Sequence, residues 1–428
     1  MNRINSPFTR NILFLTLWQG SVYIIPLILL PYLSRTLGVE GFGYFALALA
    51  LAAALSLIPE WGFSLTGTQK VSQRRDEPAE LVSVFWSVMT AKIVLLVISL
   101  SFLFALIFTM PGWRPLLPIL SAIVPHLLTS GINANWFLQG MERMGLFTAS
   151  ALAGRLLAIP MTIVLVKTPD DLSVAILIQG MSGLISAIFS LILATRVLGQ
   201  WRHRVRLRAV LGEITGGFQV FLSTSSVSLY TQLNVVILAS VSGSAQAGLL
   251  GGADRLRRAA QGITGPVVMA FFPKINRAFA LDPTGARLMM LRFLAFQTAV
   301  HAGISVLLWL FAPVLVEIVL GPAYSDAVVV LRVLALAPFF VGISNAVGIN
   351  MLIPIGLRGR FTFVIMTSAL FNIALILPLC LKFGALGAAG CLVFTEALVA
   401  AMMSFLLFTS PTWRDLGRPS PTASLPIN

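Results

Sequence analysis

Long apolar stretches, separated by short polar connections, follow one another from residue 12 to residue 408. A helix rises about 1.5 Å per residue, so about 20 apolar residues suffice to cross the hydrocarbon core of a bilayer. The pattern predicts twelve membrane-spanning helices and hence an all-α polytopic membrane protein. The predicted spans cover approximately 12–33, 44–64, 82–109, 116–138, 147–166, 173–195, 214–241, 246–272, 289–319, 327–353, 361–381 and 385–408.

Two similar turns divide these spans into two sets of six. A G-x-x-x-x-G stretch joins the first two spans at 38–43, and a second joins the seventh and eighth at 243–248. Because six is even, both halves enter the membrane in the same sense, which predicts two six-helix lobes with pseudo-two-fold symmetry along the membrane normal. The predicted domains are an N-terminal lobe (1–195), a basic cytoplasmic connector (196–212), a C-terminal lobe (213–408) and a cytoplasmic tail (409–428).

The distribution of basic residues predicts the orientation. The N-terminus, the loops after even-numbered spans and the tail hold most of the Lys and Arg outside the spans, whereas the other connections carry only Arg35, Arg114, Lys167 and Lys382. Cytoplasmic loops are rich in Lys and Arg, so both termini are expected in the cytoplasm. The connector RVLGQWRHRVRLR (196–208) is best interpreted as an anchor on anionic lipid headgroups.

Composition excludes a soluble domain, because 57% of the residues are hydrophobic and only 10% are charged. The formal net charge of +14 does not indicate a nucleic-acid partner, since aromatic residues do not interleave with the basic ones. Cys380 and Cys391 lie in apolar segments, where Cys packs as a small hydrophobe. No disulfide framework, metal site, cofactor motif or phosphate-binding P-loop is indicated, so ATP-driven transport by this chain is not expected.

One predicted span contains an unusual group of charges. In LLGGADRLRRAAQG (249–262), Asp254, Arg255, Arg257 and Arg258 fall within little more than one helical turn. At about 100° per residue they share one side of the helix. A central Arg costs about 2.5 to 3.5 kcal/mol on insertion scales, so three facing lipid would be costly. The stretch therefore predicts contact with a watery cavity or an anionic ligand.

Several segments, in this order, resemble the polysaccharide-biosynthesis membrane proteins, the Wzx-type flippases of the superfamily that includes the multidrug-and-toxin exporters. They are PYLSRTLGVEGFGYF (31–45), EWGF (60–63), NWFLQGMERM (135–144), SLYTQLNVVILASVSGSAQAGLLGGADRL (228–256), FFPKI (271–275) and FGALGAAG (383–390). The resemblance covers about 11–408. One departure is LLGGA (249–253), where this family often has an aromatic-x-x-Ala stretch.

The resemblance implies a twelve-span, two-lobe transporter of the bacterial inner membrane. Its substrate would be a polyprenyl-diphosphate-linked oligosaccharide, such as an O-antigen or other surface polysaccharide repeat unit, moved to the outer leaflet by alternating access. Membrane lipids, and glycosyltransferases or a polymerase of the same pathway, are the partners expected.

A diphosphate headgroup needs a hydrated, cationic route, and Arg suits it because its planar fork binds phosphate oxygens in pairs. Candidate substrate-binding residues are Arg255, Arg257, Arg258, Arg155, Lys92 and Arg35. Four of them have a plainer interpretation: an ion pair with Asp254 for Arg258, an interhelical pair for Arg155 and Lys92, and a solvated anchor for Arg35. Arg292 and Arg332 are discounted because they begin their spans near an interface and can snorkel.

Ion coupling requires a titratable group inside the membrane, and Glu60 and Asp254 are the candidates. His126 and His301 also titrate in a suitable range, although a lone His in an apolar span is more often a packed residue. An alternative function on the same fold is the ion-coupled export of small organic cations or drugs. An enzyme is disfavoured because the outer loops are short, and their one acidic pair, Asp170-Asp171 after Pro169, is predicted to form a turn or the start of a span.

Overall fold

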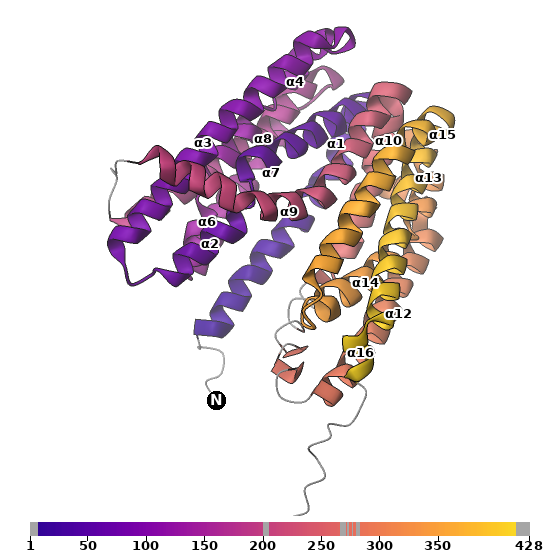
Figure 1. Cartoon of the computed structure of the whole chain (residues 1–428). Helices are drawn as coiled ribbons and strands as arrows, with labels where there is room; N and C mark the ends of the chain where they lie inside the picture. Colours follow the sequence, from indigo (N-terminus) through magenta and orange to yellow (C-terminus); the bar gives the residue numbers. More distant parts are fainter. Residues whose placement is uncertain are drawn as a thin grey trace, which may run out of the picture. The chain divides into compact units, whose positions relative to one another are not determined.

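The computed structural model describes residues 7–199, 205–265, 271, 274–275, 277–279 and 283–416, and these are nearly all helical (Figure 1). Contacts group the chain up to Gly251, together with Val319–Ala323, into one compact unit, here unit 1. Gly252–Ile318 and the chain from Tyr324 onward form unit 2. These units are defined by contacts, whereas the predicted lobes are defined by repeat symmetry, so the lobe boundaries stay a prediction.

Unit 1 contains the first nine α-helices and the beginning of the tenth. They are α1 (Pro7–Glu60), α2 (Phe63–Gln73), α3 (Pro78–Thr109), α4 (Leu117–Ser121), α5 (Val124–Ile132), α6 (Asn135–Gly140), α7 (Met144–Leu165), α8 (Leu172–Leu198), α9 (Leu207–Ser242) and α10 (Ser244–Gly262), with 3₁₀ turns at Pro111–Leu116 and Pro169–Asp171. Unit 2 continues with α12 (Pro283–Leu315), α13 (Ala327–Leu334), α14 (Ala337–Val347), α15 (Arg358–Thr409) and α16 (Pro411–Asp415). Wider π-helical turns follow α12 at Val316–Leu320 and α14 at Gly348–Leu352.

The described helices confirm a multi-pass, helical membrane protein. Among the described residues, seven helices are long and apolar enough to cross a membrane, or eight when the bent pair Gly112–Ser121 and Val124–Gly140 is included. α1 has 54 residues and α15 has 52. A span needs about 20 residues. Each of these two helices is interrupted by a glycine with a non-helical backbone, Gly38 in α1 and Gly384 in α15.

The two G-x-x-x-x-G turns have matching backbones and touch each other within unit 1. Gly38 (φ 66°, ψ 179°) and Gly243 (φ 90°, ψ 164°) both adopt conformations that favour glycine. A methyl group on Gly43 would overlap the carbonyl of Ser244, and one on Gly248 would overlap the carbonyl of Val39. Each turn therefore packs its last glycine against the residue that follows the first glycine of the other, a reciprocal contact of the kind that a two-fold axis produces.

The EWGF segment ends α1 and attaches it to α9. Trp61 (φ 42°) and Gly62 (φ 77°) both have positive φ, which breaks the helix before α2 begins. The Trp61 ring stacks on Phe221 with a centroid separation of 4.1 Å, and its Nε1 donates to the carbonyl of Ile214 at 2.8 Å. Trp61 and Gly62 of this motif thus have a structural role.

The NWFLQGMERM segment forms α6 and packs on α2. The Trp136 ring lies against Gly67, and Gly140 lies against the side chain of Val71. After α6, Glu142 (φ 55°) forms an ion pair with Arg75, with 2.7 Å between Oε1 and Nη2. The Arg75 hydrogen bond and charge hold the pKa of this exposed carboxyl below its usual value. The segment fixes a turn between helices.

The predicted Asp170-Asp171 turn is confirmed. Pro169–Asp171 is a 3₁₀ turn at the start of α8, closed by a capping box in which Thr168 and Asp171 exchange hydrogen bonds. Backbone N–H groups of Lys167 and Thr168 donate to the Asp171 carboxylate, each at 2.9 Å, and lower its pKa. This acidic pair closes a turn.

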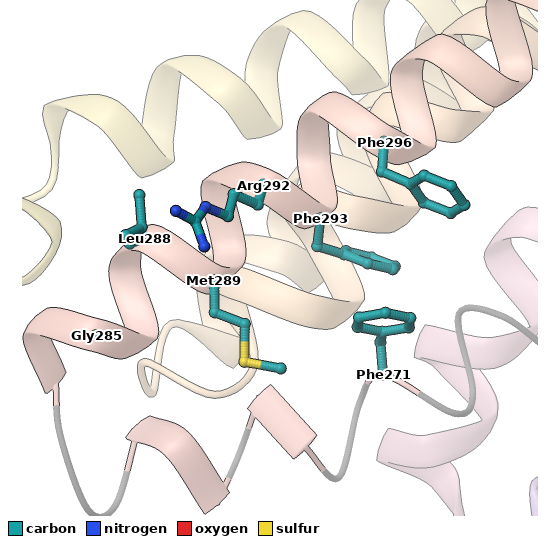
Figure 2. A pocket seen from close by; sticks show the side chains of 7 residues that line it. All are labelled: Phe271, Gly285, Leu288, Met289, Arg292, Phe293 and Phe296. Carbon is teal, nitrogen blue, oxygen red and sulfur yellow. The ribbon is translucent and has the colours of Figure 1, made fainter.

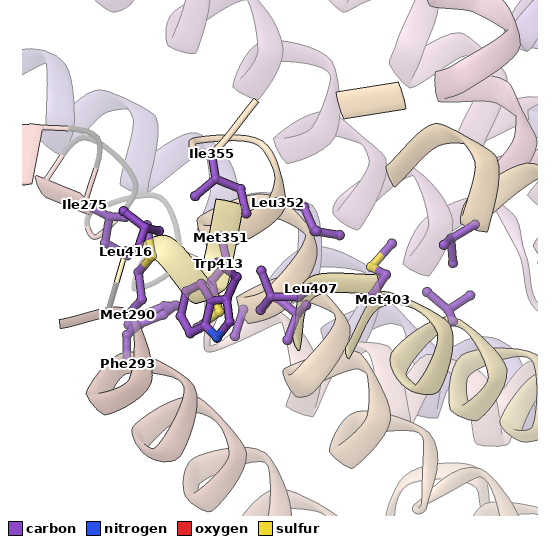
Figure 3. Close-up of a cluster of buried hydrophobic side chains, with 14 of the residues drawn as sticks. Ile275, Met290, Phe293, Met351, Leu352, Ile355, Met403, Leu407, Trp413 and Leu416 are labelled. Carbon is purple, nitrogen blue, oxygen red and sulfur yellow. The ribbon is translucent and has the colours of Figure 1, made fainter. Parts of the chain in front are cut away.

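The core of unit 2 forms between α12, the end of α14 and the two ends of α15 (Figure 3). Met290, Phe293, Met351 and Trp413 are buried there. Ser410 caps α16 by accepting from the backbone N–H of Trp413 at 3.2 Å, which turns the Trp413 ring into this cluster. The described end of the chain is therefore packed against unit 2.

Candidate functional site

The predicted charge group on α10 forms one ion-paired cluster. In unit 2, Arg257 donates to Oδ1 of Asp254 through Nε at 2.8 Å and Nη2 at 2.7 Å, and Arg258 Nε donates to Oδ2 at 2.5 Å. Arg257 Nη1 also reaches Oε1 of Gln261 at 2.6 Å. The i, i+3 and i, i+4 spacing places all three charges together, as the helical period predicts.

Burial separates the roles of these arginines. Side-chain exposure is 11% for Asp254 and 8% for Arg257, against 43% for Arg258. One carboxylate between two guanidinium groups leaves one positive charge uncompensated within the trio. Arg255, on the same turn of α10, is partly buried. The exposed part of Arg258 is where this cluster can meet an anion.

Two predicted residues of unit 1 meet each other. Lys92 on α3 is 1% exposed, and its Nζ lies 3.5 Å from Oε1 of Glu60, which is 39% exposed at the end of α1. A buried ammonium is stable only with a partner, and Glu60 supplies it. The substrate-binding candidate and the ion-coupling candidate therefore form one interhelical pair, which was the plainer interpretation of Lys92.

The other two candidates in unit 1 lie on α7 and α1. Arg155 is partly buried on α7 and its Nη1 donates to Oγ of Ser21 on α1 at 2.9 Å. Arg35 is exposed and lies beside Gly321, while the neighbouring Ser34 hydroxyl donates to the Leu320 carbonyl at 3.1 Å.

A buried polar chain in unit 2 was not among the predicted site residues. Thr264 Oγ1 lies 3.0 Å from Nε2 of His301, and the Nδ1 of His301 lies 2.9 Å from the carbonyl of Gln297. His301 and Gln297 are completely buried, and neither polar atom of the Gln297 amide has a hydrogen-bond partner among the described residues. The sequence signal is a Gln and a His one turn apart in an apolar span.

An apolar pocket of about 320 Å³ lies against the start of α12 (Figure 2). It is lined by Phe271, Gly285, Leu288, Met289, Arg292, Phe293 and Phe296. The rings of Phe271 and Phe293 lie 4.8 Å apart, while Leu288 and Phe296 are half exposed at its rim. Among these lining residues the cation is Arg292, which was discounted from the sequence. An apolar lining with an arginine suits an apolar chain that carries an anionic end.

Comparisons with known proteins agree with this architecture. Two proteins described as "Putative O-antigen transporter" are similar over nearly their whole lengths. That of Escherichia coli (strain K12) is 34% identical, covering 94% of this chain and 97% of the relative, and that of Shigella dysenteriae is 28% identical, covering 92% and 98%.

Two solved structures with a similar fold are described as multidrug transporters. An inward-facing MATE family transporter of the MOP superfamily superposes with a TM-score of 0.64 at 15% identity, covering 92% of this chain and 96% of that one. The MATE multidrug transporter DinF-BH gives 0.62 at 18% identity, covering 95% and 94%. At such identities the likeness shows the fold alone. The sequence profile of the polysaccharide biosynthesis proteins matches residues 8–279, and the chain belongs to this family.

Proposed function

We propose that this protein is a flippase that moves a polyprenyl-diphosphate-linked oligosaccharide, an O-antigen or similar repeat unit, from the cytoplasmic to the outer leaflet of the bacterial inner membrane. The 34% identity to an O-antigen transporter over 94% of the chain carries the proposal. The charge cluster on α10 supports it, because a net positive group in a membrane span suits an anionic headgroup. The protein would perform no chemical step and is not an enzyme.

The proposed topology has twelve spans with both termini in the cytoplasm. α1 and α15 would each contribute two spans, and the bent pair would contribute one. The other seven would be α3, α7, α8, α9, α10, α12 and the stretch Ala327–Leu352. The lobes would be 1–195 and 213–408, joined by the basic connector 196–212 and followed by the tail 409–428. The matching turns at Gly38 and Gly243 support this repeat.

The candidate residues would have different roles in transport. A diphosphate offers oxygens that guanidinium groups bind in pairs, and Arg258 and Arg255 would supply these donors. Arg257 would act as a positioning residue, since it is buried and engaged with Asp254 and Gln261. In the first lobe, Lys92, Arg155 and Arg35 would be the substrate-binding residues. Ion coupling at Glu60 would act through its pair with Lys92, whereas both oxygens of Asp254 already accept hydrogen bonds.

Arg258→Ala is expected to lower transport on the order of tenfold to a hundredfold at near-normal protein levels. A hydrogen bond to a charged group contributes about 1.5 to 3 kcal/mol, and 1.4 kcal/mol is a factor of ten. Surface O-antigen in a strain lacking its own flippase measures this, with membrane protein quantified in parallel. Arg74→Ala, at a partly exposed arginine just after α2 that pairs with Glu80 in the first turn of α3, serves as the control. Unchanged transport in Arg258→Ala would remove this residue from the route.

Mass spectrometry of lipid that copurifies with the protein tests the substrate class. The protein is expressed in cells that accumulate a diphosphate-linked glycan, and this glycan is expected in the purified sample. Its absence, together with acid-dependent resistance to cationic dyes, would instead favour the export of organic cations. The fold permits that alternative, but Arg and Lys outnumber Asp and Glu within the spans, which is unfavourable for a cationic substrate.

A further inference from the structure

The pocket at the start of α12 has a buried apolar wall and an exposed rim (Figure 2). Phe293 is buried and its ring lies 4.8 Å from that of Phe271, whereas Leu288 and Phe296 are about half exposed. The volume of about 320 Å³ is at the lower end of the range for ligand pockets. The pocket therefore suits a single apolar chain better than a large polar ligand.

The rim continues into an apolar stripe along α12. At about 100° per residue, the exposed residues of this stripe fall within roughly 100° of one another around the helix, together with Arg292. They are Leu288, Phe296, Val306, Leu307, Leu310 and Val314. Exposed apolar surface of this extent marks contact with a membrane. Lipid chains are thus the ligands with direct access to the pocket.

Two cations lie at the same pocket. Arg292 lines it and is exposed, and Nζ of the exposed Lys274 lies 5.4 Å from the ring centroid of Phe271, another lining residue. No ion pair among the described residues involves either cation. Residues 271–300 contain four Lys or Arg and one Asp. An anionic group is the electrostatic complement of this surface.

The depth of Arg292 suits a lipid headgroup. α12 has 33 residues, and about 20 suffice to cross the hydrocarbon core, so its first turns extend into the headgroup region. Arg292 is the tenth residue of this helix, and a long side chain from there can reach the interface. Phe296 lies one turn deeper. A phosphate at Arg292 and an apolar chain at Phe296 would follow the direction of a membrane lipid.

We propose that this pocket binds one anionic phospholipid, with its headgroup at Arg292 and Lys274 and one acyl chain between Phe271 and Phe296. In the proposed topology the start of α12 is on the cytoplasmic side, where basic pockets between membrane helices bind anionic headgroups. Phe271 belongs to the connection between α10 and α12, so a bound lipid would hold this connection against α12. The binding does not depend on the flippase function.

Native mass spectrometry of the full-length protein tests the headgroup. The protein in detergent is titrated with phosphatidylglycerol or with phosphatidylethanolamine of the same acyl chains. We expect one phosphatidylglycerol to bind about tenfold more tightly than phosphatidylethanolamine. Arg292→Ala is expected to lose about this factor, as is usual for a hydrogen bond to a charged group, and Arg292→Lys to keep part of the preference. Arg360→Ala, at an exposed arginine in the first turn of α15, is the matched control.

Photo-crosslinking tests the place of the acyl chain. Phosphatidylglycerol with a diazirine in one chain is irradiated with the protein, and peptide mass spectrometry locates the adducts. We expect them in residues 285–296 of the wild type. Leu288→Trp adds bulk at the half-exposed rim and is expected to lower their yield at least about fivefold, at the scale of 1 kcal/mol per factor of five. Leu370→Trp, at a 74% exposed leucine of α15, is expected to leave the yield unchanged.

Three results would overturn the proposal. They are equal affinity for the two phospholipids in the wild type, unchanged affinity for phosphatidylglycerol in folded Arg292→Ala, and adducts that lie outside residues 285–296. If polyprenyl diphosphate displaces phosphatidylglycerol at equal concentration, the pocket holds the carrier of the substrate, and the phospholipid assignment is wrong. A wild type that binds phosphatidylglycerol here but flips nothing would refute the proposed function alone.

Discussion

Asp254→Ala is expected to destabilise the folded protein by about 3 to 5 kcal/mol, the cost of leaving a buried charge without its partner. Arg257 is the reason, because its side chain is 8% exposed and its pair of contacts to Asp254 would be lost. Arg258 is exposed enough to turn to water. The measurement is the thermal midpoint of the monodisperse protein in detergent, with the amount in the membrane as a second readout.

The double variant Asp254→Leu/Arg257→Met is the matched control. It removes both buried charges and fills similar volume, and such replacements are often neutral or stabilising. We expect it to recover most of the stability lost in Asp254→Ala. If Asp254→Ala is as stable as the wild type, Arg257 has another buried partner or reaches water, and its assignment as a positioning residue is wrong.

Gly43→Ala and Gly248→Ala are expected to cost about 3 kcal/mol or more each, at the upper end of the penalty for overpacking. The added methyl group would overlap a backbone carbonyl, of Ser244 in one case and of Val39 in the other. A backbone carbonyl cannot rotate away as a flexible side chain can. The thermal midpoint and the yield of monodisperse protein measure the effect.

Gly390→Ala provides the comparison for a glycine inside a helix. A methyl group there meets nothing within 4 Å, and Ala is the better helix former by about 1 kcal/mol. It is expected to be neutral or slightly stabilising. Equal stability of Gly43→Ala and Gly390→Ala would show that the reciprocal contact between the two turns is not tight.

Much of the fold can be predicted from local sequence patterns, but the contacts between the turns cannot. Apolar length predicts the helices, and the spacing of glycines predicts turns at 38–43 and 243–248, which the positive φ of Gly38 and Gly243 confirms. That Gly43 packs on the residue after Gly243 could not be predicted, because it depends on how distant segments meet. The same holds for the stacking of Trp61 on Phe221.

At the candidate site, spacing predicts neighbours on one helix but not partners from others. The period of α10 places Asp254 beside Arg257 and Arg258, and it cannot say that one carboxylate holds both. The pair between Lys92 and Glu60 joins two helices and was only one of two interpretations open. The contact of Thr264 with Nε2 of His301 joins distant parts of the chain, so the sequence does not predict it.

Flipping of a defined substrate by the purified protein tests the central claim most directly. Lipid-linked oligosaccharide is placed in both leaflets of proteoliposomes, and an added glycan-cleaving enzyme that cannot enter reports the fraction accessible from outside. With wild-type protein the whole pool is expected to become accessible, whereas protein-free vesicles and those with Arg258→Ala retain a protected half on the same timescale. A protected half that persists with folded wild-type protein, under an imposed pH gradient of either sign, would contradict the flippase function.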